Sequence, residues 1–293
     1  ENQYERVNHV DQKVLACMKG TYEKCYHLFD NYTMDDTIAE ENTKEEASEA
    51  KKFLNAVMKT KVMTIARSYI NHSRKHRGKN QLSQKAFMKT VAKAWFGQFD
   101  TRYAKSVSGF EHTFIGEKSQ GKLKGYHFWL KYLIDDSKSN HDGEDQIDFD
   151  YQADKGNNPH YIAIKFLRDD DTNDDLNESD GEIDDFSENE ELDGNAWTDD
   201  EEEEENDVED RFQSDPEPKL SKGISSFMVG SSPEATMALG MVLMEIARQS
   251  NAHRSHNNNG VSAKVFGDVF QFFCFVGGRG RQNIKTVYPQ LFS

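Results

Sequence analysis

The sequence predicts an α+β fold, in which a helical N-terminal part is followed by a part rich in strands. Two observations support this class. Apolar residues recur at helical spacing through the first third of the chain. After residue 160 the pattern changes to short segments rich in β-branched and aromatic residues. Helices that come first and strands that come later are typical of α+β domains, not of alternating units.

The N-terminal third is predicted to contain two helices. Residues 43–46 read Thr-Lys-Glu-Glu, a capping box in which threonine and glutamate satisfy backbone N–H groups at a helix start. Apolar residues then recur at helical spacing over residues 50–65. A second helix is predicted to open at Ser83, with apolar side chains on one face through Trp95. The basic residues 74–79 between these helices are expected to form a solvated loop, with phosphate contact as the alternative.

The middle of the chain contains the change from helix to strand. Leu123 to Ile134 predicts a third helix, with His127 on its apolar face. Residues 160–167 and 224–229 are each predicted to form a strand.

The C-terminal segment is predicted to contain one buried helix and two strands. Residues 232–234 read Ser-Pro-Glu, which supplies an N-cap, a first-turn proline and a first-turn acid to a helix that runs through Ile246. Residues 261–276 predict two strands broken near Gly267, and the glycines of residues 277–280 predict a turn.

Composition narrows the class of protein. A chain of 293 residues forms one or two domains with a sizeable core. Its three cysteines indicate neither a disulfide framework nor a cysteine zinc site. A run of about 18 apolar residues is absent, so we expect no membrane association. We expect a monomer. The chain begins with Glu1, so a secreted processed form and a cytoplasmic or nuclear protein both stay open.

The formal net charge of −16 hides two opposite regions. Residues 169–217 hold 26 of the 52 acidic residues and one of the 36 basic residues, so they carry −25 and the remainder carries +9. This acidic stretch lacks apolar periodicity, and we expect a disordered insertion because it cannot offset its ordering entropy. The basic remainder favours a polyanionic partner. The predicted organisation is a helical N-terminal part (1–168), the acidic insertion (169–217) and a C-terminal part (218–293).

Four ordered blocks carry candidate chemistry. They are SGFEHTFIGE at 108–117, GYHFW at 125–129, KGISSFMVGSSPE at 222–234 and TVYP at 286–289. The first two blocks contain His112 and His127, and the third begins with Lys222.

Two imidazoles and one ammonium suffice to cut RNA through its own 2′-hydroxyl group. One imidazole removes the proton of that hydroxyl, the other protonates the leaving 5′-oxygen, and the ammonium balances charge on the phosphate. Histidine suits both proton transfers because its reference pKa is about 6.5. We assign His127 as general base, His112 as general acid and Lys222 as the phosphate-stabilising cation. The alternative assignment, with His112 as general base and His127 as general acid, stays open.

The order and spacing of the blocks resemble the EndoU (XendoU-type) family of uridylate-specific endoribonucleases. The resemblance extends upstream to residues 28–32 and 53–58 and covers nearly all of the chain outside the insertion. It implies a catalytic part built on antiparallel sheets and cleavage of single-stranded RNA at uridines, which leaves 2′,3′-cyclic phosphate ends. It also favours Lys222 over Lys219, because the family places its catalytic lysine four positions before the serine that is Ser226 here.

The same resemblance implies further site residues and a cofactor. Glu111 and Glu117 match supporting carboxylates of the family. Ser226, Thr286 and Tyr288 match positions that form the substrate-binding wall, where a hydroxyl reads the uracil edge and an aromatic ring braces the nucleoside. Animal members use a divalent cation, usually Mn²⁺, for which the sequence identifies no ligands.

The chain departs from the family at one point. The usual S-P-E-F-E continues here as Ala235 and Thr236 after Ser-Pro-Glu, and we expect altered packing behind the site. The departure keeps an alternative open: a non-catalytic RNA-binding protein whose acidic segment engages basic proteins. A metal-dependent phosphoesterase would instead need a carboxylate-rich ligand set among ordered elements.

The acidic insertion is predicted to restrain RNA binding. A tethered polyanion just before Lys222 competes with RNA for the same basic surface at high effective concentration. Deletion of residues 169–217 should therefore raise RNA affinity, most at low salt, and leave base preference unchanged. Affinities measured across a salt series test this, and superimposable curves for the two proteins would leave a solvated loop with no effect.

Overall fold

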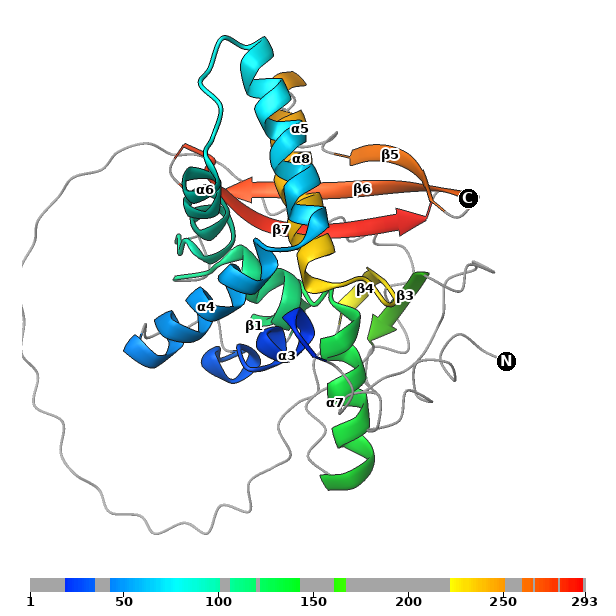
Figure 1. Cartoon of the computed structure of the whole chain (residues 1–293). Coiled ribbons are helices and arrows are strands. Elements are labelled where there is room, and N and C mark those ends of the chain that lie inside the picture. The colour runs from blue at the N-terminus through cyan, green and yellow to red at the C-terminus, as the bar shows by residue number, and fades with distance from the viewer. Residues whose placement is uncertain are drawn as a thin grey trace, which may run out of the picture.

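The computed structural model describes residues 19–34, 43–100, 106–119, 122–142, 161–166, 222–250, 260–265, 267–278 and 280–291 (Figure 1). Its helices are α3 (Thr21–Tyr26), η1 (Phe29–Asn31), α4 (Lys44–Val57), α5 (Lys61–His76), α6 (Gln84–Phe96), η2 (Glu111–Ile115), α7 (Trp129–Asp142) and α8 (Pro233–Ser250). Its strands are β1 (Glu117–Ser119), β2 (Lys122–Lys124), β3 (Tyr161–Phe166), β4 (Lys222–Met228), β5 (Gly260–Val265), β6 (Asp268–Gly277) and β7 (Asn283–Leu291). The α+β prediction is confirmed.

The described strands form three antiparallel sheets. Two are hairpin-like pairs, β1–β2 and β3–β4, and the third has the order β5-β6-β7. Strand β7 was not predicted. It contains Pro289, which lacks the N–H that an inner strand needs. Its place at the end of the three-stranded order removes that obstacle.

Helix α8 connects the helical part to the sheet. It lies beside α5 on one side and against β6 and β7 on the other (Figure 1). The buried Glu245 carboxylate of α8 accepts hydrogen bonds from the Ser73 hydroxyl of α5 and from the guanidinium of Arg77, the residue after α5. The contact is a buried charge that is both paired and hydrogen-bonded, as a buried carboxylate requires.

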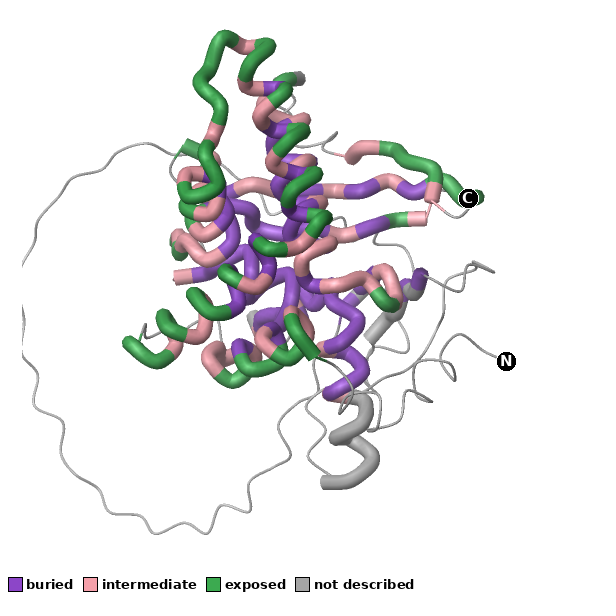
Figure 2. The backbone as a smooth tube through the Cα atoms, viewed as in Figure 1, coloured by how far each residue is buried: buried purple, intermediate pink, exposed green. Residues whose placement is uncertain are grey.

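Buried segments gather at the centre of the described part of the chain (Figure 2). A row of phenylalanine side chains belongs to this core or packs against it. Successive ring centroids are 4.8 Å apart for Phe96 and Phe110, 4.7 Å for Phe110 and Phe114, and 4.6 Å for Phe114 and Phe128. Burial of each phenylalanine contributes roughly 1.5–3 kcal/mol. The row fixes the two histidine segments to α6, because Phe110 precedes Glu111 and Phe128 follows His127 in the chain.

The predicted capping box is confirmed, but the helix it opens is shorter than expected. Thr43 Oγ1 accepts from the Glu46 N–H (3.2 Å), and the Thr43 N–H donates to the Glu46 carboxylate (2.8 Å). The periodic run over residues 50–65 belongs to two helices, since α4 ends at Val57 and α5 begins after Thr60. The Thr60 hydroxyl caps α5 by accepting from the Met63 N–H (3.4 Å).

Strands β3 and β4 pair across the predicted insertion. Their register places Phe166 opposite Lys222, with an irregularity between Ile164 and Phe166. The parts of the chain on either side of residues 169–217 therefore share one sheet. The insertion itself lies outside the described residues. Among the described helices, none combines the length and the apolar character that a membrane crossing needs.

Two cysteines are predicted to be unreactive in the folded protein. Burial raises the pKa of the Cys274 thiol to about 12, against a smaller opposing effect of the Arg248 charge. Burial, with a smaller contribution from Glu234, raises the pKa of Cys25 well above its ordinary value. Because the thiolate is the reactive form, iodoacetamide should label neither residue at mildly alkaline pH until the chain unfolds. Peptide mass spectrometry after native and denatured labelling checks this, and equal labelling in both states would contradict it.

Candidate active site

His112 lies in η2, a short π-helix, a type of turn that is frequent at functional sites. Two reciprocal contacts hold its start: the Glu111 N–H donates to Ser108 Oγ (3.2 Å), and the Ser108 N–H donates to the Glu111 carboxylate (3.3 Å). Gly116 ends the turn with φ at 90°, and its N–H donates to the Glu111 carbonyl (2.9 Å). Glu111 therefore anchors the turn through both its backbone and its side chain.

The His112 ring faces a second buried carboxylate. Its Nδ1 lies 3.1 Å from Oε2 of Glu117, the first residue of β1. The distance is that of an ion pair. Since both side chains are buried, the contact orients the ring and supplies a counter-charge to its protonated form.

The hairpin β1–β2 brings the two histidine segments together. The chain leaves His112, forms the hairpin and returns, so that the Tyr126 N–H donates to the His112 carbonyl (2.9 Å). The His127 N–H then donates to the Thr113 carbonyl (2.8 Å). These two backbone hydrogen bonds fix the separation of the histidines without any side chain.

Gly125 is required at the closest approach of the two segments. Its φ is 66°, and a Cβ there would lie 1.8 Å from the His112 carbonyl oxygen and 2.9 Å from His112 Cδ2. Only glycine fits this position. The following Tyr126 also has a positive φ of 66°, an uncommon conformation for a residue with a side chain.

The prediction of a helix through residues 123–134 was therefore wrong in its first half. Leu123 belongs to β2, and α7 begins at Trp129. Two consecutive residues with positive φ cannot belong to a right-handed helix, so His127 lies in the turn that precedes α7. Its apolar neighbours are in the core, but the periodicity that predicted a helical face was coincidental.

Lys222 reaches the same turn from the other side. It is the first residue of β4, it is buried, and its Nζ donates a hydrogen bond to the Gly125 carbonyl. Gly125 therefore contacts the backbone of His112 and the ammonium of Lys222, and it lies two residues before His127. The structure brings all three predicted catalytic side chains to this turn.

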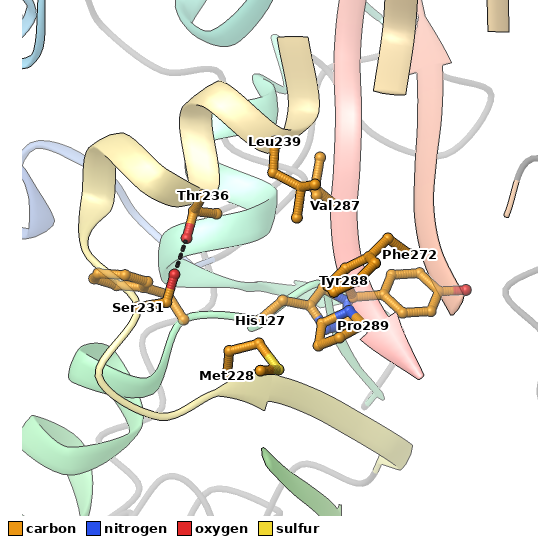
Figure 3. Close-up of a pocket in the computed structure, with 10 residues that line it drawn as sticks. His127, Met228, Ser231, Thr236, Leu239, Phe272, Val287, Tyr288 and Pro289 are labelled. Atoms are coloured by element: carbon orange, nitrogen blue, oxygen red, sulfur yellow. Dashed lines mark hydrogen bonds between the residues drawn. The ribbon is translucent and has the colours of Figure 1, made fainter. Parts of the chain in front are cut away.

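The His127 ring lies between β4 and β7 (Figure 3). Its Nδ1 is 3.1 Å from the Ser226 carbonyl, and its ring stacks on Tyr288 with centroids 4.7 Å apart and planes 22° apart. A carbonyl only accepts hydrogen bonds, so Nδ1 carries the proton of the neutral ring and Nε2 is its basic atom. The Tyr288 ring also stacks on Phe273, with centroids 5.2 Å apart.

The predicted substrate-binding residues lie in the same two strands. The Ser226 hydroxyl donates to the Pro289 carbonyl and ties β4 to β7. Thr286 is buried on β7, and Tyr288 is half-buried two residues further along the same face.

Sequence reasoning missed Ser225 and the role of Gly125. Ser225 Oγ donates to the Tyr126 carbonyl (2.5 Å) and so holds the turn that carries His127. Ser225 lies beside a predicted site serine, and nothing in the sequence distinguishes it. Gly125 begins the GYHFW block, and a glycine in such a position could have indicated a close backbone approach.

A small cavity of about 30 Å³ lies behind His127 and Tyr288 (Figure 3), room for about one water molecule. Thr236 lines it, and the Thr236 and Ser231 hydroxyl oxygens are 3.2 Å apart. Thr236 is one of the two positions where the sequence departs from the family pattern. One position of the departure therefore lines the same cavity as His127, and the effect on packing stays a prediction.

The described residues do not form a cage for a divalent cation. They contain no cluster of three or more His, Cys, Asp or Glu side chains with suitable placement. On α5, His72 and His76 place their Nε2 atoms 3.0 Å apart, which is fewer ligands than a structural zinc site uses. Mn²⁺ prefers oxygen ligands, and the described residues contain no group of three or more carboxylates placed to bind it.

Comparison with known proteins connects this geometry to a family. The model of the family described as "Endoribonuclease XendoU" matches residues 2–173, which include both site histidines. The chain belongs to the XendoU endoribonuclease family. The resemblance seen in the sequence motifs is thereby confirmed. Lys222, Ser226, Thr286 and Tyr288 lie beyond the matched range.

Individual XendoU relatives align with part of the chain. Poly(U)-specific endoribonuclease-B of Xenopus laevis is 35% identical over 136 residues, which is 45% of each protein. The uridylate-specific endoribonuclease of Homo sapiens is 28% identical over 159 residues, 54% of this chain and 36% of that protein. The chain thus spans less than half the length of these relatives.

A solved structure supports the fold over a longer range. It is described as "The structure of XendoU: a splicing independent snoRNA processing endoribonuclease", and it covers 94% of this chain and 79% of its own. The TM-score is 0.57 at 21% sequence identity. The likeness includes the helical N-terminal part and the sheets that follow, so the predicted architecture is confirmed.

Proposed function

We propose that this XendoU-family protein is an endoribonuclease that cleaves single-stranded RNA at uridines and leaves 2′,3′-cyclic phosphate ends. The observation that carries the proposal is the convergence of His112, His127 and Lys222 on the turn at Gly125. The names of the relatives, poly(U)-specific and uridylate-specific endoribonuclease, support the substrate class.

His127 acts as general base in this proposal. Its Nδ1 donates to the Ser226 carbonyl, so Nε2 takes the proton of the ribose 2′-hydroxyl. The 2′-oxygen then attacks the adjacent phosphorus and forms the new P–O2′ bond. The stack on Tyr288 holds the imidazole plane during this transfer.

His112 acts as general acid. As the P–O5′ bond breaks, the protonated ring gives its proton to the leaving 5′-oxygen. The Glu117 carboxylate 3.1 Å away holds the ring in orientation and balances its charge before the transfer. Glu111 supports the step indirectly, since it anchors the π-turn that presents His112.

Lys222 stabilises the phosphorane between the two histidines. Its ammonium is fixed by the Gly125 carbonyl, so little reorganisation is needed when negative charge grows on the phosphoryl oxygens. No step requires a metal ion.

Ser226, Thr286 and Tyr288 form the proposed uridine wall. The Ser226 hydroxyl donates to Pro289 and retains lone pairs that can accept the N3–H of uracil. The Tyr288 ring braces the nucleoside beside His127, and buried Thr286 shapes the same face of β7. We assign residues 1–168 and 218–293 to one catalytic unit interrupted by the acidic insertion at 169–217, acting as a monomer.

Incubation with an RNA oligonucleotide that contains a single uridine tests the function. The expected result is one cut 3′ to the uridine, with a cyclic phosphate identified by mass spectrometry of the product. Parallel reactions with manganese and with a chelator measure the cation dependence implied by the family. RNA binding without any cut under either condition would favour the non-catalytic alternative, to which the Thr236 departure points.

Ser226→Ala should relax base preference more than it slows cleavage. A site that hydrogen-bonds one base edge loses discrimination when the group is removed, whereas the His127 contact uses the Ser226 backbone and survives. Competition between oligonucleotides that differ only in U, C or A at the cut position measures this. An unchanged preference for uridine would move specificity to the Ser226 backbone or to Tyr288.

A further inference from the structure

The strongest unassigned feature is a long region of one charge sign. Residues 51–99 contain twelve Lys and Arg and no Asp or Glu. The region covers the end of α4, all of α5 and all of α6. The first part of α4, in contrast, mixes Lys44 with Glu45, Glu46 and Glu49.

On α6 the positive charge is ordered into a row. Lys85, Lys89 and Lys93 are all exposed and recur every four residues, so they share one face at intervals of about 6 Å. The buried Phe87, Val91 and Trp95 lie on the opposite face. The core thus fixes which way the lysines point. Within the described ranges, no carboxylate forms an ion pair with any of the three.

The lysine row is rigidly joined to the proposed site. Asn283, the first residue of β7, donates to the carbonyls of Lys93 (3.1 Å) and Gly97 (2.6 Å) at the end of α6. The Lys93 ammonium donates to the side chain of Gln282. From Gln282 the chain runs six residues, mostly along β7, to Tyr288, a length of at most about 20 Å. A few nucleotides of single-stranded RNA span that length.

We propose that Lys85, Lys89 and Lys93 bind backbone phosphates of single-stranded RNA several nucleotides away from the cut. The inference rests on the proposed function for its choice of polyanion. Exposed lysines at phosphate-like intervals on a rigid helix bind the backbone without reading bases. The row therefore raises affinity for long RNA and leaves both the chemistry and the uridine preference to the site near Gly125.

The expected contribution of the lysine row to RNA affinity follows from the release of counterions when lysines neutralise phosphates. For a single strand, the binding constant falls by about 0.7 log units per tenfold rise in salt concentration, for each phosphate that the protein neutralises. Three lysines that each neutralise one phosphate therefore contribute about 2 to the slope of log binding constant against log salt. Their contribution to affinity is then roughly a hundredfold larger at about 0.1 M salt than at 1 M. Neutral substitutes for the row should weaken binding of long RNA by about tenfold to a hundredfold at low salt.

The test compares two triple variants of the full chain. One is Lys85→Gln, Lys89→Gln and Lys93→Gln. Its matched control is Lys44→Gln, Lys51→Gln and Lys52→Gln, which removes three exposed lysines from α4. Cleavage of a uridine dinucleotide and of a long RNA with one uridine is measured across a salt series. RNA binding is measured separately in a His127→Ala background.

The expected result is a row variant with normal kcat/KM on the dinucleotide, a raised KM on the long RNA and a salt slope lower by about 2. The α4 control should change these values much less. Equal effects of both variants, or no effect of the row on a protein that cleaves long RNA, would overturn the inference. Row-dependent binding by a protein that cuts neither substrate would keep the inference and reject the proposed function. Absence of both binding and cleavage would reject both.

Discussion

Alanine in place of Lys222 is expected to lower cleavage of uridine-containing RNA by about two decades or more, with the fold retained. Removal of one preorganised charge from a transition state costs about 10²–10³ in rate. Lys222 is buried and fixed on the Gly125 carbonyl, so water or a neighbouring flexible lysine cannot replace it. Single-turnover cleavage under saturating RNA measures the effect on chemistry, and thermal unfolding checks the fold.

Lys285→Ala is the matched control for this experiment. Lys285 is also a buried lysine, and it lies on β7 just outside the TVYP block at 286–289. It should keep most of the activity. A near-normal rate in Lys222→Ala would reject Lys222 as the stabilising cation, as would an equal loss in the Lys285 variant.

Replacement of Gly125 by alanine is expected to disable the site through the backbone alone. The new Cβ would lie 1.8 Å from the His112 carbonyl oxygen, and φ is 66°. A left-handed conformation costs an L-residue roughly 1–2 kcal/mol. Overpacking adds about 1–3 kcal/mol, so the sum is a large share of the roughly 5–15 kcal/mol that stabilises a domain. We expect a lower unfolding midpoint and cleavage too slow to measure.

Gly78→Ala separates the two contributions. Gly78 has nearly the same φ, 67°, but a Cβ there would meet no atom within 4 Å. This variant should lose only the backbone contribution, roughly 1–2 kcal/mol, and keep full activity. Denaturant titrations of both variants measure the difference. Equal destabilisation would mean that close packing of the two histidine segments is not needed.

Side-chain signals in the sequence predicted much of the fold. The capping box at Thr43, the Ser-Pro-Glu start of α8 and the break near Gly267 each depend on local chemistry that a short segment contains. The break between α4 and α5 was missed because apolar spacing continued across Thr60, whose capping role has no apolar signature.

In the site, too, features with a side-chain signal were predicted and features of the backbone were not. The motif blocks predicted which segments carry His112, His127 and Lys222. They could not predict that Tyr126 and Gly125 join those segments, because backbone hydrogen bonds between distant residues leave no pattern in side chains. The π-turn at Glu111 was invisible for a similar reason, since its helical period differs from the one sought.

The pairing of Phe166 with Lys222 has a consequence for how the family can change. The last residue of β3 pairs with the first residue of β4. The pairing of the two strands therefore fixes the position of Lys222, whatever the length of the segment that connects them. Each doubling of such a connection costs only about 0.6 kcal/mol of closure entropy. The Phe166–Lys222 pair is therefore a position at which evolution or an engineer can exchange the connecting segment while Lys222 stays at the start of β4.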